Sequence, residues 1–139
     1  MSVLQDNQQL IERYFERVWN QGFVNELDEM MDLNYINHSP GAPNPEPGPK
    51  GLKPIIENMR SAFPDLHYVI HNMVVTDTQV AVHTTMKGTH LGDFFGLPAT
   101  GKKISVFQMQ IERIKNGKIV EHWRVTNDLE LMKQLGQVS

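Results

Sequence analysis

The 139-residue sequence contains no cysteine. This absence excludes disulfide bonds, thiolate metal sites and cysteine nucleophiles. No apolar run reaches the length of a membrane-spanning helix, and the first residues lack the basic region and apolar run of a signal peptide. We therefore expect a cytoplasmic protein that makes no contact with a membrane.

The sequence also has little excess of charge of either sign. The net charge is −3 and the isoelectric point is about 6.0, with lysines and arginines scattered along the chain. This pattern gives no electrostatic basis for binding nucleic acid. No P-loop, dinucleotide-binding fingerprint or Gly-x-Ser-x-Gly motif is present, so the sequence gives little support to a nucleotide cofactor.

Six histidines raise the question of a metal site. His67 and His71 are four residues apart, but they fall in a strand-like stretch, and no His-Glu-x-x-His motif is present. We therefore expect no metal. His38 and His90 stand where predicted strands meet loops, and histidine is a natural acid or base near neutral pH. Both are candidates for proton transfer, with a structural role as the alternative.

Apolar periodicity predicts helices in the first half of the chain. Residues 4–20 form an amphipathic stripe, and Asn25 resembles the N-cap of a short helix. A brief strand is predicted at 34–38. The stretch 39–49 has five prolines and must be a loop, either the rim of a cavity or a plain crossover. A third helix is predicted over 52–63, with Pro54 in its first turn.

The second half of the chain changes to a period of two. Strands are predicted over 66–75 and 80–88, followed by an ordered glycine-rich loop and a long hairpin over 102–128. Helices that precede a run of antiparallel strands indicate an α+β fold, with the helices packed on one face of a curved sheet. We expect one domain over 1–139, since no repeat or second unit is visible.

Asn116-Gly117 predicts a two-residue turn in the long hairpin. A regular hairpin around this turn pairs Gln110 with Trp123 and Gln108 with Val125. Since side chains alternate across a strand, this register predicts two faces. One face carries Gln108, Gln110, Trp123 and Asn127, and the other carries Phe107, Met109, His122 and Arg124.

Asn127 and Asp128 stand between the last strand and a helix predicted over 128–135. Asn127 followed by Glu130 has the spacing of a capping box, and Asp128 in the first turn complements the helix dipole. Capping alone would explain both residues.

Several motifs together resemble a known family. Asn37-His38 precedes the proline-rich loop, and the runs AFPD at 62–65, GTHLGDFFG at 88–96, GKIVEHW at 117–123 and QLG at 134–136 follow in order. In this order and spacing, the chain resembles the SnoaL-like polyketide cyclase (ester cyclase) family of the nuclear-transport-factor-2-like superfamily.

This resemblance implies a cone-shaped α+β barrel, a curved antiparallel sheet with N-terminal helices over a deep, mostly apolar pocket. It implies that the face with Gln108, Gln110, Trp123 and Asn127 lines the pocket and that the face with Phe107, Met109, His122 and Arg124 points away from it. It also implies a homodimer or higher homo-oligomer, no metal or cofactor, and intramolecular aldol condensation of a polyketide ester. An aspartate near the end of the last strand is the family's acid/base. At its usual position, four residues after Trp123 and nine before Gly136, this chain has Asn127, and Asp128 follows.

We therefore expect a cofactor-independent enzyme that acts by acid/base chemistry on a hydrophobic carbonyl substrate. The alternatives are a non-catalytic module that binds a hydrophobic ligand and an oligomerisation scaffold with a filled pocket. The expected acid/base residues are Asp128, His38 and His90, and the expected substrate-binding residues are Asn127, Trp123, Gln110, Gln108, Tyr14 and Phe63.

Overall fold

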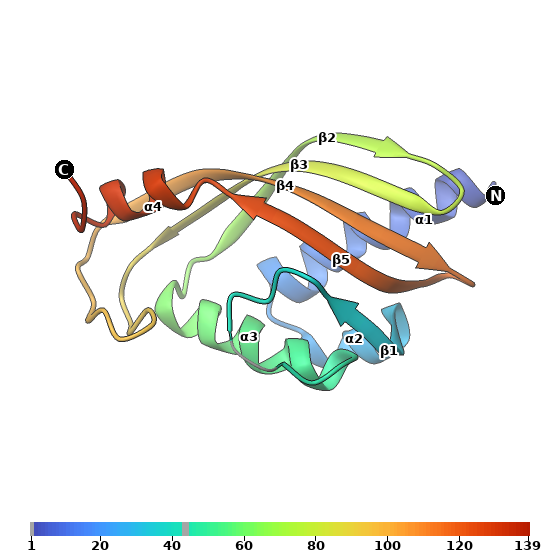
Figure 1. Cartoon of the computed structure of the whole chain (residues 1–139), viewed down its shortest axis with the longest axis horizontal. Helices are drawn as coiled ribbons and strands as arrows, with labels where there is room; N and C mark the ends of the chain where they lie inside the picture. Colours follow the sequence, from blue (N-terminus) through green and yellow to red (C-terminus); the bar gives the residue numbers. More distant parts are fainter. Residues whose placement is uncertain (1, 43–44) are drawn as a thin grey trace.

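The computed structural model describes residues 2–42 and 45–139, which form a curved five-stranded sheet with helices along one face (Figure 1). The strand order is β1-β5-β4-β3-β2; β2 to β5 are antiparallel neighbours, and β1 runs parallel to β5. The strands are β1 Met31–Asn37, β2 His67–Val75, β3 Gln79–Thr89, β4 Lys103–Lys115 and β5 Lys118–Thr126. The helices are α1 Val3–Arg13, η1 Tyr14–Asn20, η2 Val24–Glu26, α2 Leu27–Met30, α3 Pro49–Ala62 and α4 Asp128–Gln134.

The predicted N-terminal helix is confirmed as α1 and its π-helical continuation η1. Ser2 begins it with a capping box, because its hydroxyl accepts the Gln5 N–H at 3.2 Å. The predicted cap at Asn25 is wrong. Asn25 lies inside the 3-10 turn η2, and α2 starts after Glu26 without a side-chain cap. The turn displaces Asn25 from the helix boundary, where a cap would have to stand.

Helix α3 begins at Pro49, earlier than the predicted start at residue 52. Pro49 therefore takes the first-turn position that the sequence pattern gave to Pro54, which lies inside the helix. The predicted loop 39–49 is a loop up to Gly48 in its described part, while positions 43 and 44 fall outside the described residues. The Gly48 N–H donates to the Tyr35 carbonyl at 2.8 Å, which brings the loop back to β1.

The turn of the β4–β5 hairpin is confirmed. Asn116 and Gly117 both have positive φ, 52° and 73°, as a two-residue hairpin turn requires. Ile114 pairs with Ile119 next to this turn, but a β-bulge between Arg113 and Ile114 then shifts the register by one residue.

This bulge exchanges the two faces of β5. Gln110 pairs with Arg124 and not with Trp123, and Gln108 pairs with Thr126. The predicted inward position of Trp123 is therefore wrong, as are the outward positions of His122 and Arg124, because a one-residue slip turns every side chain to the opposite face. Phe107 and Met109 are on the outer face as predicted, each 48% exposed.

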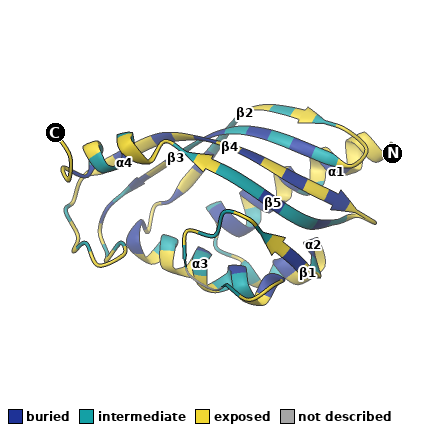
Figure 2. Cartoon of the chain, viewed as in Figure 1, coloured by how far each residue is buried: buried dark blue, intermediate teal, exposed yellow. Residues whose placement is uncertain are grey.

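The face of the sheet that meets the helices is the core. Burial alternates without a break along β4, as Figure 2 shows. Its buried positions mix aliphatic with polar side chains, since Ile104 and Val106 are followed by Gln108, Gln110 and Glu112. The core therefore becomes polar along β4. Within 2–42 and 45–139, no helix is both long and apolar enough to cross a membrane.

Candidate active site

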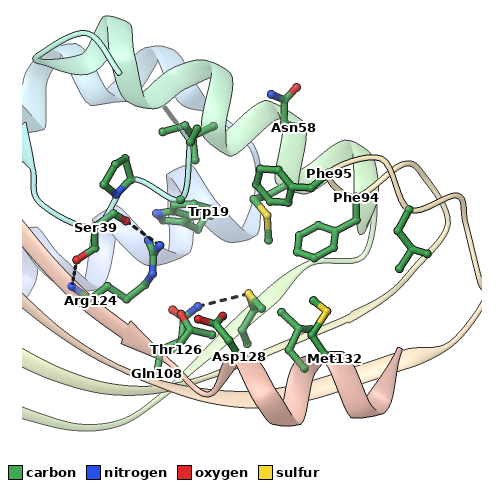
Figure 3. A pocket seen from close by; sticks show the side chains of 18 of the residues that line it. Trp19, Ser39, Asn58, Phe94, Phe95, Gln108, Arg124, Thr126, Asp128 and Met132 are labelled. Atoms are coloured by element: carbon green, nitrogen blue, oxygen red, sulfur yellow. Dashed lines mark hydrogen bonds between the residues drawn. The ribbon is translucent and has the colours of Figure 1, made fainter. Parts of the chain in front are cut away.

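A cavity of about 1120 Å³ lies between the sheet and the helices (Figure 3). The proline-rich loop forms part of its rim through residues 39–42. The loop between β3 and β4 contributes Phe94 and Phe95, and the N-terminal helix contributes Trp19. Helix α3 contributes Ile55, Asn58, Met59 and Ser61. The sheet and α4 contribute residues that include Met86, Gln108, Arg124, Thr126, Asp128, Leu131 and Met132.

The polar part of the wall comes from β4, β5 and the start of α4. Gln108 is buried, and its side-chain oxygen accepts an N–H of Gln110 at 2.8 Å. Thr126 is its partner across the hairpin. Asp128 follows two residues later in the first turn of α4, and it is exposed. A carboxylate, a hydroxyl and a carboxamide thus border one cavity wall, where Figure 3 shows all three.

Arg124 is the single basic residue among the described residues that line the cavity. Its backbone N–H donates to the Ser39 hydroxyl at 2.9 Å, and its guanidinium Nη2 donates to the Ser39 carbonyl at 2.8 Å. The side chain is partly buried. These two bonds fix the first residue of the proline-rich loop to β5.

A second polar group lies on the same face, next to Gln110 along β4. Glu112 is fully buried, and its Oε1 is 2.6 Å from Nδ1 of His122, its cross-strand partner. Burial raises the pKa of Glu112, while His122 and Arg124 lower it. The Tyr35 hydroxyl and Glu112 Oε2 are two of the four buried side-chain atoms without a hydrogen-bond partner among the described residues. Glu112, His122 and Tyr35 are not among the residues that line the cavity.

Comparison with known proteins identifies the family. A family model described as SnoaL-like polyketide cyclase matches residues 9–135. The chain belongs to the SnoaL-like polyketide cyclase family. The resemblance in the sequence motifs is thereby confirmed.

Relatives of this family include enzymes with named substrates. The chain is 29% identical to aklanonic acid methyl ester cyclase DnrD of Streptomyces peucetius over 92% of this chain and 89% of that protein. It is 24% identical to nogalonic acid methyl ester cyclase of Streptomyces nogalater over 85% of this chain and 89% of that protein. The structure of TsrD from Streptomyces laurentii superposes with a TM-score of 0.87 at 28% identity, covering 96% of this chain and 97% of that one. The predicted α+β, nuclear-transport-factor-2-like fold is confirmed.

In this SnoaL-like fold, two of the predicted site residues line the cavity, namely Asp128 and Gln108. Asn127 caps α4, because its side-chain oxygen accepts the Glu130 N–H at 3.3 Å. Gln110 is buried behind Gln108. Tyr14 and Phe63 are core residues, exposed by 2% and 0%.

The structure places His38 and Trp123 together on the opposite side of β5. Their rings stack at 4.8 Å between centroids, and His38 Nε2 is 2.9 Å from a Glu121 carboxylate oxygen. Neither side chain is among the described residues of the cavity lining.

His90 is fully buried at the start of the loop between β3 and β4. Its Nδ1 accepts the Thr100 N–H at 3.2 Å, so this ring closes the loop. The other ring nitrogen, Nε2, is buried without a hydrogen-bond partner, and His90 is absent from the described cavity lining.

Reasoning from the sequence missed Arg124 and Thr126 as cavity residues. One signal was available. Moving the register by one residue places His122 opposite Glu112, where the two side chains form a cross-strand hydrogen bond. Within the described part of the chain, no group of three or more histidine, cysteine or acidic residues could hold a metal ion.

Proposed function

We propose that this chain is a cofactor-independent cyclase that closes a ring within a hydrophobic carbonyl compound by an intramolecular aldol reaction. Asp128 acts as the general base. The observation that carries the proposal is the position of the Asp128 carboxylate on the wall of a large cavity, in a chain of the SnoaL-like family.

The reaction needs one group that removes and returns a proton. The Asp128 carboxylate takes a proton from a carbon that is flanked by carbonyl groups. The resulting enolate carbon attacks a ketone or aldehyde carbon of the same molecule, a C–C bond forms, and the carbonyl π electrons move to oxygen. This alkoxide takes the proton back from Asp128, so no atom is gained or lost.

Gln108 and Thr126 supply the donors that this step requires. The carboxamide N–H and the hydroxyl border the same wall as Asp128, where they stabilise the negative charge on the enolate oxygen. The cavity also holds the two reacting carbons close together, which removes much of the entropic barrier to ring closure.

The shape of the cavity supports a multi-ring substrate. Its volume of about 1120 Å³ is slightly above the range of ordinary ligand pockets, and Trp19, Phe94 and Phe95 offer aromatic surfaces. The relatives act on aklanonic and nogalonic acid methyl esters. We therefore propose a fused-ring aromatic polyketide as the substrate class.

The proposal is tested by incubating the protein with aklanonic acid methyl ester or nogalonic acid methyl ester and separating the products by liquid chromatography with mass detection. A cyclase gives a product of unchanged mass and altered retention time, at a rate above buffer alone. The competing function is a module that binds the ligand without turnover. It is favoured by Asn127, which stands where the family's aspartate is expected from the sequence, and it predicts binding with no new product.

We also propose that the protein assembles as a homodimer or higher homo-oligomer through the outer face of the sheet. Phe107, Met109 and Ile111 follow one another on this face of β4, exposed by 48%, 48% and 42%. Burying such side chains favours association.

A further inference from the structure

The guanidinium of Arg124 is a partly buried charge for which the described residues provide no carboxylate partner. One of its N–H groups donates to the Ser39 carbonyl. The positive charge of Arg124 lowers the pKa of Glu112, but the Glu112 carboxyl group is hydrogen-bonded to His122 and not to Arg124. The remaining guanidinium donors therefore border the cavity without an anion.

A charge in this setting favours an anionic ligand. Removing a charged group from water is unfavourable unless an opposite charge or hydrogen bonds replace the water. A guanidinium has five N–H donors in a planar fork, and a carboxylate matches two of them at once. Ser39 holds the side chain in place from the loop, so the fork is oriented before a ligand arrives.

We propose that the ligand of this cavity carries a carboxylate and that Arg124 binds it. This inference rests on the proposed function for the reaction at the other end of the ligand. It separates the chain from its curated relatives, which are named for methyl esters. An uncharged ester would leave the guanidinium without its anion.

The chain geometry indicates where on the ligand this carboxylate lies. Arg124 lies in β5 and Asp128 lies in the first turn of α4, and Thr126 stands between them in the chain on the same cavity wall (Figure 3). A negative charge beside the reacting C–H bond would oppose enolate formation. The carboxylate therefore belongs at the end of the ligand away from Asp128, with the aromatic rings between the two.

The test compares an aromatic acid with its own ester. Binding of anthraquinone-2-carboxylate and of its methyl ester is measured by isothermal titration calorimetry at neutral pH. The acid should bind wild type tighter than the ester by about 10- to 100-fold, as expected for hydrogen bonds between charged groups. The variant Arg124→Met should lose this preference and keep its affinity for the ester.

Arg113→Met is the matched control, because Arg113 is in the same hairpin but pairs with Glu121 on the outer face at 3.0 Å. It should bind both probes as wild type does. Circular dichroism checks that each variant is folded, and the comparison in wild type needs no variant.

Three results would overturn the inference: equal affinity of wild type for acid and ester, binding of neither probe, or an acid preference that survives in Arg124→Met. Because no turnover is measured, these results are independent of the cyclisation assay. A cyclisation assay that fails with the methyl esters and with their free acids, while acid binding is intact, would reject the proposed reaction and leave the carboxylate site standing.

Discussion

At the scale of single residues, Glu112 is a buried carboxyl group whose protonation is linked to folding. Burial raises its pKa above the ordinary value of glutamate, against the lowering effect of His122. The folded state thus holds this proton more tightly than the unfolded state does. Between the ordinary and the raised pKa, the folded state binds more protons, so its stability falls as pH rises through that window.

We predict that Glu112→Gln removes the part of the pH dependence of stability that comes from this carboxyl group. The variant should show a smaller loss of stability than wild type as pH rises from the ordinary glutamate pKa upwards. Urea unfolding of both proteins across this range measures it. Identical pH profiles for wild type and variant would refute the assignment.

The sequence identified some cavity residues and missed others for a physical reason. Gln108 could be predicted because β4 is regular from its start, and Asp128 because a carboxylate near the end of the last strand was expected. Arg124 could not be predicted because its direction depends on the bulge beside Arg113. Strand periodicity alone does not show where an extra residue enters a strand.

At the scale of elements, Asn127 belongs to helix α4. Its side-chain oxygen accepts the Glu130 N–H and thereby satisfies one of the free donors of the first turn. We predict that Asn127→Ala lowers the unfolding free energy by about 1 kcal/mol. Asn127→Asp should keep the stability, since aspartate caps equally well, and it should not raise cyclisation activity.

Urea unfolding and the cyclisation assay measure both variants. A rise in activity in Asn127→Asp would show instead that position 127 reaches the substrate. In that case, the bulge-shifted register would not describe the active enzyme.

The elements themselves were largely predictable because local signals define them. Asn116-Gly117 specifies the hairpin turn, and the period-two runs specify β2 and β3. The failures were the cap at Asn25 and the first-turn position of Pro54. In both cases the prediction of a helix was correct, but its first residue was not. The 3-10 turn η2 occupies the predicted start at Asn25, and Pro49 begins α3 in place of Pro54.

At the scale of the whole molecule, the outer face of the sheet is the surface proposed for self-association. We predict that wild type has at least twice the monomer mass of 15.9 kDa in sedimentation equilibrium. Phe107→Asp should shift the mass towards the monomer, because a charge replaces an apolar side chain on that face.

Val3→Asp is the control, since Val3 is 56% exposed in α1, on the N-terminal helix. It should leave the assembly unchanged. A monomeric wild type at all concentrations would contradict assembly through the sheet.

The central claim is that the Asp128 carboxylate performs the proton transfer in the cavity. The most direct measurement compares kcat/KM for cyclisation in wild type, Asp128→Asn and Asp93→Asn. Asp93 also borders the cavity, but its carboxylate accepts the Gly96 N–H at 3.0 Å, which asparagine can still do. Loss of a general base predicts a fall of about 10²- to 10⁴-fold in Asp128→Asn, with Asp93→Asn close to wild type. Full activity in Asp128→Asn would contradict the account.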